Sequence, residues 1–424
     1  MNIKEDFLHY IWLNKRLDIN NLLTTDGHKI QILNFGNYTQ QAGPDFFNAQ
    51  LIIDNQKWAG NLEIHVKSSD WFLHHHETDA NYNNVILHVV WEHNTDVYRK
   101  DNSKIPVLEL KSYVSKFEID KYFNLTTTKS WIFCENEIAS VDKIIISNWQ
   151  ERLYFERLES KIIPFQHLFI QTNSDWETTL FCMLAKNFGL NINGTSFFEL
   201  AKSIPFHVIK KEASHLIHLE ALFFANANLL SNEWQDVYAL ELQEKAKYLI
   251  HKYQLNSIEI TPIQFFKLRP DNFPTIRLAQ LAMLYHTKQS LFLELILANT
   301  KEEIYKIFSI STSNYWNTHY NFDKESRFKS KKISTSFIDL LIINTIIPLK
   351  FLHAKLNGKE VTERLVDLIQ SVHPEKNTTI EKFNHFNIQS KNALQSQALL
   401  QLKNEYCNNK RCLQCSIGVT LLKN

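Results

Sequence analysis

Residues 43–67 read GPDFFNAQLIIDNQKWAGNLEIHVK and decide the fold of the N-terminal part of the chain. Apolar residues recur at alternate positions on both sides of a polar turn at residues 54–57, a pattern typical of strands with one buried face. The stretch therefore predicts a β-hairpin with strands over residues 45–53 and 58–67.

The second strand of this hairpin carries three chemically useful side chains on one face. Side chains alternate between the faces of a strand, so Glu63, His65 and Lys67 share a face at successive spacings of roughly 6.6 Å. A carboxylate, an imidazole and an ammonium group in one row can bind a divalent metal and polarise a water beside it. Asp45 begins the first strand. Its side chain lies on the same face as Glu63, His65 and Lys67 only if the hairpin loop has an odd number of residues or a strand contains a bulge.

The segments around the hairpin predict an α+β domain over residues 1–115. An amphipathic helix begins near Glu5, and further strands are expected at residues 29–33, 85–91 and 105–110. The strand VILHVVW is almost wholly apolar, as expected for a strand buried on both faces. The predicted order is a helix, a strand, the two hairpin strands, a short and partly helical connector, and two further strands. This order corresponds to a mixed sheet of the α-β-β-β-α-β type.

The rest of the chain predicts helices. We expect a linker containing Cys134 over residues 116–140, a mainly α-helical domain over residues 141–389, and a C-terminal helix with a cysteine cluster over residues 390–424. Prolines mark expected breaks between helices, Pro164 among them.

Composition and missing motifs exclude several classes of protein. Lys+Arg is 46 and Asp+Glu is 45, a net charge of +1, so any contact with nucleic acid has to come from a local basic patch. The chain contains no G-x-G-x-x-G, G-x-S-x-G or H-E-x-x-H motif. These absences argue against a dinucleotide-binding fingerprint, a nucleophile elbow and a zincin helix.

The sequence predicts a cytoplasmic protein with no membrane partner. The N-terminus lacks the apolar run of a signal peptide, and the most apolar stretch, residues 337–352, contains Asp339 and Lys350 and is expected to be a buried helix. Five unevenly placed cysteines fit a reducing compartment better than a disulfide framework.

The predicted order of elements, with a strand that opens on Pro-Asp and a strand that carries an acid and a lysine, resembles the core of the PD-(D/E)xK nuclease superfamily. The resemblance implies Mg²⁺ held by two acids and a lysine that orients or activates the attacking water. By position, Asp45 and Glu63 would hold the metal. Lys67 would be the electrostatic helper and His65 a ligand or base. The match is imperfect, because His65 stands in the lysine position of the triplet that begins at Glu63.

Four further residues are candidate accessory groups. Glu5 lies on the first predicted helix, where some superfamily members place an extra acid. His88 interrupts an apolar strand, where an imidazole needs a partner, and either faces the site or bonds to the backbone. Arg269 and Arg277 flank a predicted helix start and could hold phosphates. The alternative is a buried arginine that ties a loop to the helix ends.

The C-terminal segment carries Cys407, Cys412 and Cys415 in the spacing C-x₄-C-x₂-C. Thiolates at this spacing can converge on one ion, but three are one short of a closed tetrahedral site. Cys134 is the expected fourth ligand, because Cys182 lies among apolar residues and predicts a core position. The pattern is similar to the iron–sulfur staple of some helicase-associated and CRISPR-associated nucleases. Spacing does not separate Zn²⁺ from [4Fe–4S], and unrelated reduced cysteines are the alternative.

Longer stretches of the chain resemble a bacterial family known as domain of unknown function 2851. They span nearly the whole chain and read AGPDFFNAQL, WAGNLEIHVKSSDW, YNNVILHVVW, RPDNFPTIRLAQLA and KRCLQCSIG. This resemblance implies no activity, so the functional prediction rests on the residues.

The sequence predicts a Mg²⁺-dependent nuclease that hydrolyses DNA phosphodiesters and carries a structural Zn²⁺ or [4Fe–4S] site. One alternative is a non-catalytic scaffold that binds nucleic acid or protein on the same fold, with the Glu-His-Lys face as ordinary solvated surface. Another is a transition-metal hydrolase that uses His65, His75, His76 and His88.

Overall fold

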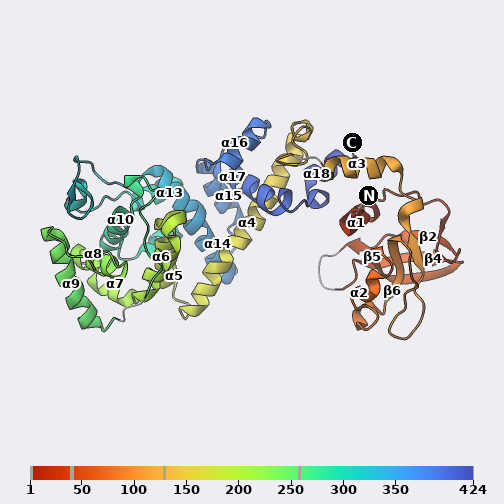
Figure 1. Cartoon of the computed structure of the whole chain (residues 1–424), viewed down its shortest axis with the longest axis horizontal. Helices are drawn as coiled ribbons and strands as arrows, with labels where there is room; N and C mark the ends of the chain where they lie inside the picture. The colour runs from red at the N-terminus through yellow and green to blue at the C-terminus, as the bar shows by residue number, and fades with distance from the viewer. Residues whose placement is uncertain (1–2, 39–42, 128–129, 256–258, 424) are drawn as a thin grey trace. The chain divides into compact units, whose positions relative to one another are not determined.

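The computed structural model describes residues 3–38, 43–127, 130–255 and 259–423. The chain forms two compact units, a sheet unit (Met1–Trp149 with Lys403–Asn424) and a helical unit (Gln150–Leu402). The prediction of an N-terminal mixed sheet followed by helices is confirmed (Figure 1). The units divide the chain at residues 149 and 402, whereas the sequence suggested limits near residues 140 and 390.

The sheet unit contains a seven-stranded sheet in the order β1-β2-β4-β5-β6-β7, with β3 paired to β4. The strands are β1 (Leu22–Leu23), β2 (Lys29–Asn34), β3 (Asn37–Tyr38), β4 (Phe46–Ile53), β5 (Gln56–Lys67), β6 (Val85–Glu92) and β7 (Val107–Glu109). The pairs from β1 to β5 are antiparallel, whereas β5–β6 and β6–β7 are parallel. The sheet is therefore mixed, and β5 is the strand at which the direction of pairing changes.

A bulge in the β4–β5 hairpin sets the position of Asp45. The pairing register shifts by one residue between Phe46 and Ala49. Asn48, inside this interval, has a φ of 60°, a left-handed conformation that asparagine tolerates better than most residues. The shift brings Asp45 next to Glu63, and the Asp45 backbone N–H donates to Glu63 Oε2 at 3.1 Å. The bulge is one of the two arrangements that the strand alternation required.

Short helices flank the sheet. Those of the sheet unit are α1 (Glu5–Leu13), α2 (Asp70–Leu73), α3 (Lys116–Thr127) and α18 (Ser416–Lys423). Both α1 and α2 contact β5, and α18 contacts α3 (Figure 1). Phe7 and Trp12 of α1, Ile64 of β5 and Leu422 of α18 belong to one apolar core. The C-terminal helix is therefore part of the core that supports β5.

The helical unit shares the long helix α4 (Lys143–Gln171) with the sheet unit. Its other helices are α5 (Trp176–Phe188), α6 (Leu190–Ser203), α7 (Phe206–Glu212), α8 (Leu216–Asn226), α9 (Val237–Tyr253), α10 (Pro274–Thr287), α11 (Leu291–Leu297), α12 (Lys301–Ile307), α13 (Thr335–Leu341), α14 (Ile347–Leu356), α15 (Thr362–Ser371), α16 (Thr378–His385) and α17 (Ala393–Gln401). A small antiparallel hairpin in this unit is formed by β8 (His319–Asn321) and β9 (Lys324–Glu325).

The predicted helix break at Pro164 is wrong, because α4 continues through this residue. A proline inside a helix costs roughly 3 kcal/mol through its lost hydrogen bond and steric clash. Its neighbours Ile162, Phe165 and Leu168 are buried, and full burial of each such side chain contributes about 1.5–3 kcal/mol. Packing therefore outweighs the local preference.

One helical stretch, Thr335–Leu356, is long and apolar enough to cross a membrane by length and composition alone. In the structure, 72% of its most apolar window is buried inside the protein. The apolar side chains of this stretch are therefore used in the packing of the helical unit.

Candidate functional site

Four side chains with metal-binding atoms meet beside β5. His65 Nε2 lies 3.1 Å from His74 Nδ1 and 3.5 Å from Glu63 Oε1. His76 Nε2 lies 3.3 Å from the same Glu63 oxygen. One ligand atom from each of the three histidines lies within 4.8 Å of the other two. Glu63, His65, His74 and His76 form what is called below the histidine–glutamate cluster.

The segment after α2 brings two histidines of one run to the cluster and leaves the third outside. His75 has a φ of 59°, and its side chain is 81% exposed. This left-handed residue redirects the backbone between His74 and His76, so both can face β5. The transition-metal alternative drawn from the sequence named His75 and His76 of this run and left out His74. The available signal was the His-x-His spacing next to a strand that carries Glu63 and His65.

His88 supports the cluster from the neighbouring strand. The parallel register of β5 and β6 pairs Glu63 with His88, which is fully buried. His88 Nε2 lies 2.8 Å from His65 Nδ1. If His65 Nδ1–H donates to His88, the Nε2 lone pair of His65 is free for a ligand, as in many metal sites. On the other side, the ring of Tyr82 stacks on His76 at a centroid distance of 3.8 Å.

An acid–imidazole pair lies beside the cluster. His9 Nε2, from α1, is 3.1 Å from Asp45 Oδ2 and 4.0 Å from Glu5 Oε1. Asp45 Oδ2 also accepts a hydrogen bond from the Ile64 backbone N–H at 2.9 Å. The structure thus brings Asp45 and Glu5 close to Glu63, and it adds His9, which the sequence interpretation missed.

Burial controls the charge of the cluster. Burial, followed by the negative charge of Asp45, holds the pKa of Glu63 well above its usual range. Burial and the neighbouring His88 lower the pKa of His65 to about 2, and burial and His76 lower the pKa of His88 to about 3. Near neutral pH Glu63 is then protonated and uncharged, and His65, His76 and His88, whose pKa values are all lowered, are neutral imidazoles.

The donor set suits a divalent cation. Within the described residues, the buried Nε2 of His76 has no hydrogen-bond partner, although a carboxylate oxygen lies 3.3 Å away. Neutral imidazoles with a carboxylate are the ligands of Zn²⁺ and related transition metals, whereas Mg²⁺ prefers oxygen ligands. The arrangement therefore favours a transition-metal ion over Mg²⁺ at this position.

We expect the chelator-treated protein to lose stability as the pH falls below about 6.5. Folded His65 and His88 stay neutral down to pKa values of about 2 and 3, whereas histidines in the unfolded chain titrate near pH 6.5. Between these pH values the two histidines bind more protons in the unfolded chain, so acidification removes their contribution to stability. Glu63, whose pKa is raised in the folded state, acts in the opposite direction, but it is one group against two. Urea unfolding at pH 8, 6 and 5 measures the slope, and His88→Phe should reduce it. Equal slopes in His88→Phe and the parent protein would contradict the expectation.

Lys67 lies at the exposed end of β5. Its backbone N–H donates to Asp70 Oδ2 at 2.9 Å, and among the described residues no hydrogen bond or ion pair reaches its ammonium group. A catalytic role for Lys67 stays a prediction.

The two candidate arginines lie in the helical unit. Arg277 is buried, and its guanidinium donates to Asn272 Oδ1 at 2.6 Å and to Gln280 Oε1 at 2.8 Å. It also lies 3.6 Å from the centre of the Phe337 ring. These contacts match the alternative in which an arginine ties a loop to a helix. Arg269 is exposed beside this loop.

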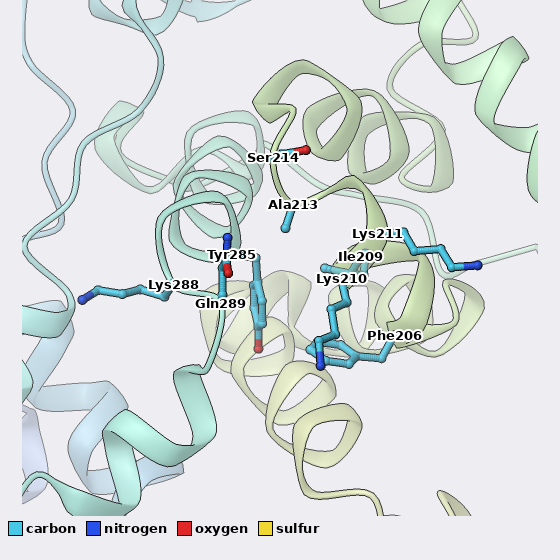
Figure 2. A pocket seen from close by; sticks show the side chains of 9 residues that line it. All are labelled: Phe206, Ile209, Lys210, Lys211, Ala213, Ser214, Tyr285, Lys288 and Gln289. Carbon is cyan, nitrogen blue, oxygen red and sulfur yellow. The ribbon is translucent and has the colours of Figure 1, made fainter.

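The helical unit also contains a cavity of about 180 Å³ between α7 and the end of α10. Its lining comprises Phe206, Ile209, Lys210, Lys211, Ala213, Ser214, Tyr285, Lys288 and Gln289. Figure 2 shows that Lys211 and Lys288 point away from one another, and Lys288 pairs with Glu294 at 2.9 Å. These lysines do not converge on one anion, so the histidine–glutamate cluster is the stronger candidate for chemistry.

Comparison with known proteins identifies a family. Residues 5–378 match the family described as protein of unknown function (DUF2851), and the match ends before the C-terminal cysteines. No curated protein and no solved structure matches the chain. Because the match covers well over half of its residues, the chain belongs to the DUF2851 family.

Proposed function

We propose that this chain is a divalent-metal-dependent hydrolase of phosphodiesters, a nuclease that acts on DNA. The observation that carries the proposal is the hairpin bulge, which places Asp45 beside Glu63 with His65 two residues further along β5. The order α1, β2, β4, β5, α2, β6, with β5 and β6 parallel, is similar to the core expected of PD-(D/E)xK nucleases. This similarity supports a phosphodiester as the substrate class.

In this proposal the histidine–glutamate cluster holds the cation, and Asp45 stands next to it as a further acid. A bound divalent cation would supply an activated water and neutralise charge on the phosphoryl group. His88 would orient His65 through the hydrogen bond between His88 Nε2 and His65 Nδ1, which lie 2.8 Å apart. The chain itself therefore provides both the ligands and the group that fixes their orientation.

His9 is the candidate proton donor of the site. Burial alone would lower the pKa of His9, but the hydrogen bond to Asp45 and the charges of Asp45 and Glu5 raise the pKa above its ordinary value. A partly protonated imidazole near neutral pH can donate a proton to a departing oxygen. His9→Gln should lower kcat strongly for a phosphodiester whose leaving oxygen has to be protonated. The same variant should lower kcat much less for a phosphodiester whose leaving group departs as a stable anion.

The direct test is cleavage of single- and double-stranded DNA by the full chain with Mn²⁺, Zn²⁺ or Mg²⁺. We expect Asp45→Asn and Glu63→Gln each to lower kcat/KM at least about 100-fold, in the range found when a charged catalytic group is lost. Asp54→Asn is the matched control, because Asp54 is an exposed acid at the turn of the same hairpin. DNA binding without cleavage in every metal would contradict the proposal and support the non-catalytic scaffold.

Lys67 should contribute to substrate binding rather than to the metal. Its exposed position at the end of β5 lets the ammonium group reach a phosphate of bound DNA. We expect Lys67→Ala to raise KM several-fold, with kcat nearly unchanged. The slope of log KM against log salt concentration should also fall by about one, as expected for the loss of one phosphate contact. Steady-state kinetics at three salt concentrations measure both effects. A fall in kcat as large as that of Glu63→Gln would instead place Lys67 in the chemical step.

A further inference from the structure

Four of the five cysteines gather in the sheet unit, although they come from distant parts of the sequence. Cys134 precedes a short 3-10 helix, whereas Cys407, Cys412 and Cys415 lie in the C-terminal segment before α18. All are free thiols, and Cys134 and Cys412 pack against the same hydrophobic core. The fifth, Cys182, is buried within α5 of the helical unit.

The structure brings the four cysteines into one region of the sheet unit, because Cys134 and Cys412 pack against the same core and Cys407, Cys412 and Cys415 lie within nine residues of chain before α18. Burial, followed by the charges of Cys415 and Cys412, raises the pKa of Cys134 to about 12. Burial and Cys415 raise the pKa of Cys412 to about 12, and burial followed by the other three cysteines raises the pKa of Cys407. Such thiols are poor nucleophiles, because the thiolate is the reactive form. A cation that displaces their protons would offset the repulsion between the thiolates so formed.

The loop that carries these cysteines is tightly built. Burial raises the pKa of the Cys415 thiol, against the smaller opposite effect of the backbone N–H groups of Gly418 and Ile417 and the side chain of Trp149. A Cβ atom on Gly418 would lie 2.3 Å from the Cys412 carbonyl oxygen, so α18 approaches the Cys412 backbone too closely for any other residue. Donors directed at a sulfur are typical of metal thiolates, whose ligands are oriented by such bonds.

We propose that Cys134, Cys407, Cys412 and Cys415 hold a thiolate-ligated metal centre, either one Zn²⁺ ion or one iron–sulfur cluster. On binding, the thiol protons pass to the solvent and four sulfur–metal bonds replace the S–H bonds. The centre would hold the C-terminal segment against the N-terminal part of the sheet unit, which contains Cys134. It is independent of the proposed hydrolase, because none of its ligands belongs to the histidine–glutamate cluster.

The test is the metal content and visible spectrum of the full chain, purified without oxygen and then reconstituted with Zn²⁺, or with Fe²⁺ and sulfide. One colourless zinc that is retained when His76 is replaced by alanine identifies the ion, whereas iron with acid-labile sulfide and a broad visible band identifies the cluster. Cys407→Ser and Cys412→Ser should each lower this metal content at least about fivefold. Cys182→Ser should leave it unchanged, and all these variants are compared in a His76→Ala background, so that zinc at the histidine–glutamate cluster does not enter the count. A parent protein that takes up neither, or a Cys407→Ser/Cys412→Ser double variant that keeps the metal, would overturn the proposal.

A measurement on the parent protein alone covers variants that fail to fold. The four thiols should resist iodoacetamide in the metal-loaded protein and become several-fold more reactive after a chelator removes the metal. Cys182 serves as the internal control, because its alkylation should not change. Equal reactivity of the four thiols before and after chelation would also overturn the proposal.

Discussion

Replacement of His76 by alanine should weaken Mn²⁺ binding to the chain at least about 100-fold, which corresponds to roughly 2.7 kcal/mol. His76 Nε2 lies 3.3 Å from Glu63 Oε1, so the substitution removes one donor from a cluster that has four. The remaining residues hold the cation more weakly. A weakly held cation stabilises the ionised form of the buried Glu63 carboxyl group less, so this group keeps its proton more readily. Mn²⁺ titration followed by electron paramagnetic resonance measures the affinity. Mn²⁺ is the preferred probe, because thiolates select softer metals than Mn²⁺.

His75→Asn is the matched control for this experiment. His75 lies between two members of the cluster, but its side chain is exposed, and asparagine tolerates its positive φ of 59°. The affinity for Mn²⁺ should therefore stay within about twofold of the parent value, since surface changes of this kind have small effects. Equal losses in His75→Asn and His76→Ala would mean that the segment, rather than its ligands, determines binding.

Gly60→Ala should destabilise the sheet unit by about 3 kcal/mol, at the upper end of the cost of overpacking. A Cβ atom at Gly60 would lie 2.5 Å from the Asn84 carbonyl oxygen and 2.5 Å from Ile86 Cγ2. Both neighbours flank or belong to β6, so β5 and β6 would have to separate at the start of their parallel pairing. Because His65 and His88 face each other across these strands, Mn²⁺ affinity should fall as well.

Gly27→Ala provides the comparison for Gly60→Ala. Gly27 has a φ of 87°, but a Cβ atom there would meet nothing within 4 Å. Only backbone strain of roughly 1–2 kcal/mol is then expected. Denaturant unfolding of both variants measures the difference. The packing account is contradicted if Gly60→Ala unfolds at the same denaturant concentration as Gly27→Ala.

The fold of the sheet unit could be predicted in outline because its strands carry a strong local pattern. The hairpin and the apolar β6 were visible in the alternation and the hydrophobic run. Strands β1 and β3 were missed, since each has two residues and no periodicity. The bulge was one of two arrangements compatible with Asp45 beside Glu63, and only the structure shows the register shift that distinguishes them.

The sequence predicted only part of the candidate site, and Asp45, Glu5 and His88 were conditional candidates from other elements. Glu63 and His65 follow from alternation along β5, whereas His9 and His74 reach the site through the packing of α1 and α2 on the sheet. The hydrophobic periodicity of a segment does not indicate which distant elements pack against it. The position of His88 depended on the register of β5 against β6, which the sequence left open.

The most direct test of the metal centre is anomalous X-ray diffraction from crystals of the full chain soaked in Mn²⁺. The account predicts an anomalous peak at bonding distance, about 2.0–2.3 Å, from the Glu63 carboxylate and the imidazoles of His65, His74 and His76. A fully soaked crystal with peaks elsewhere and none among these four side chains would contradict it.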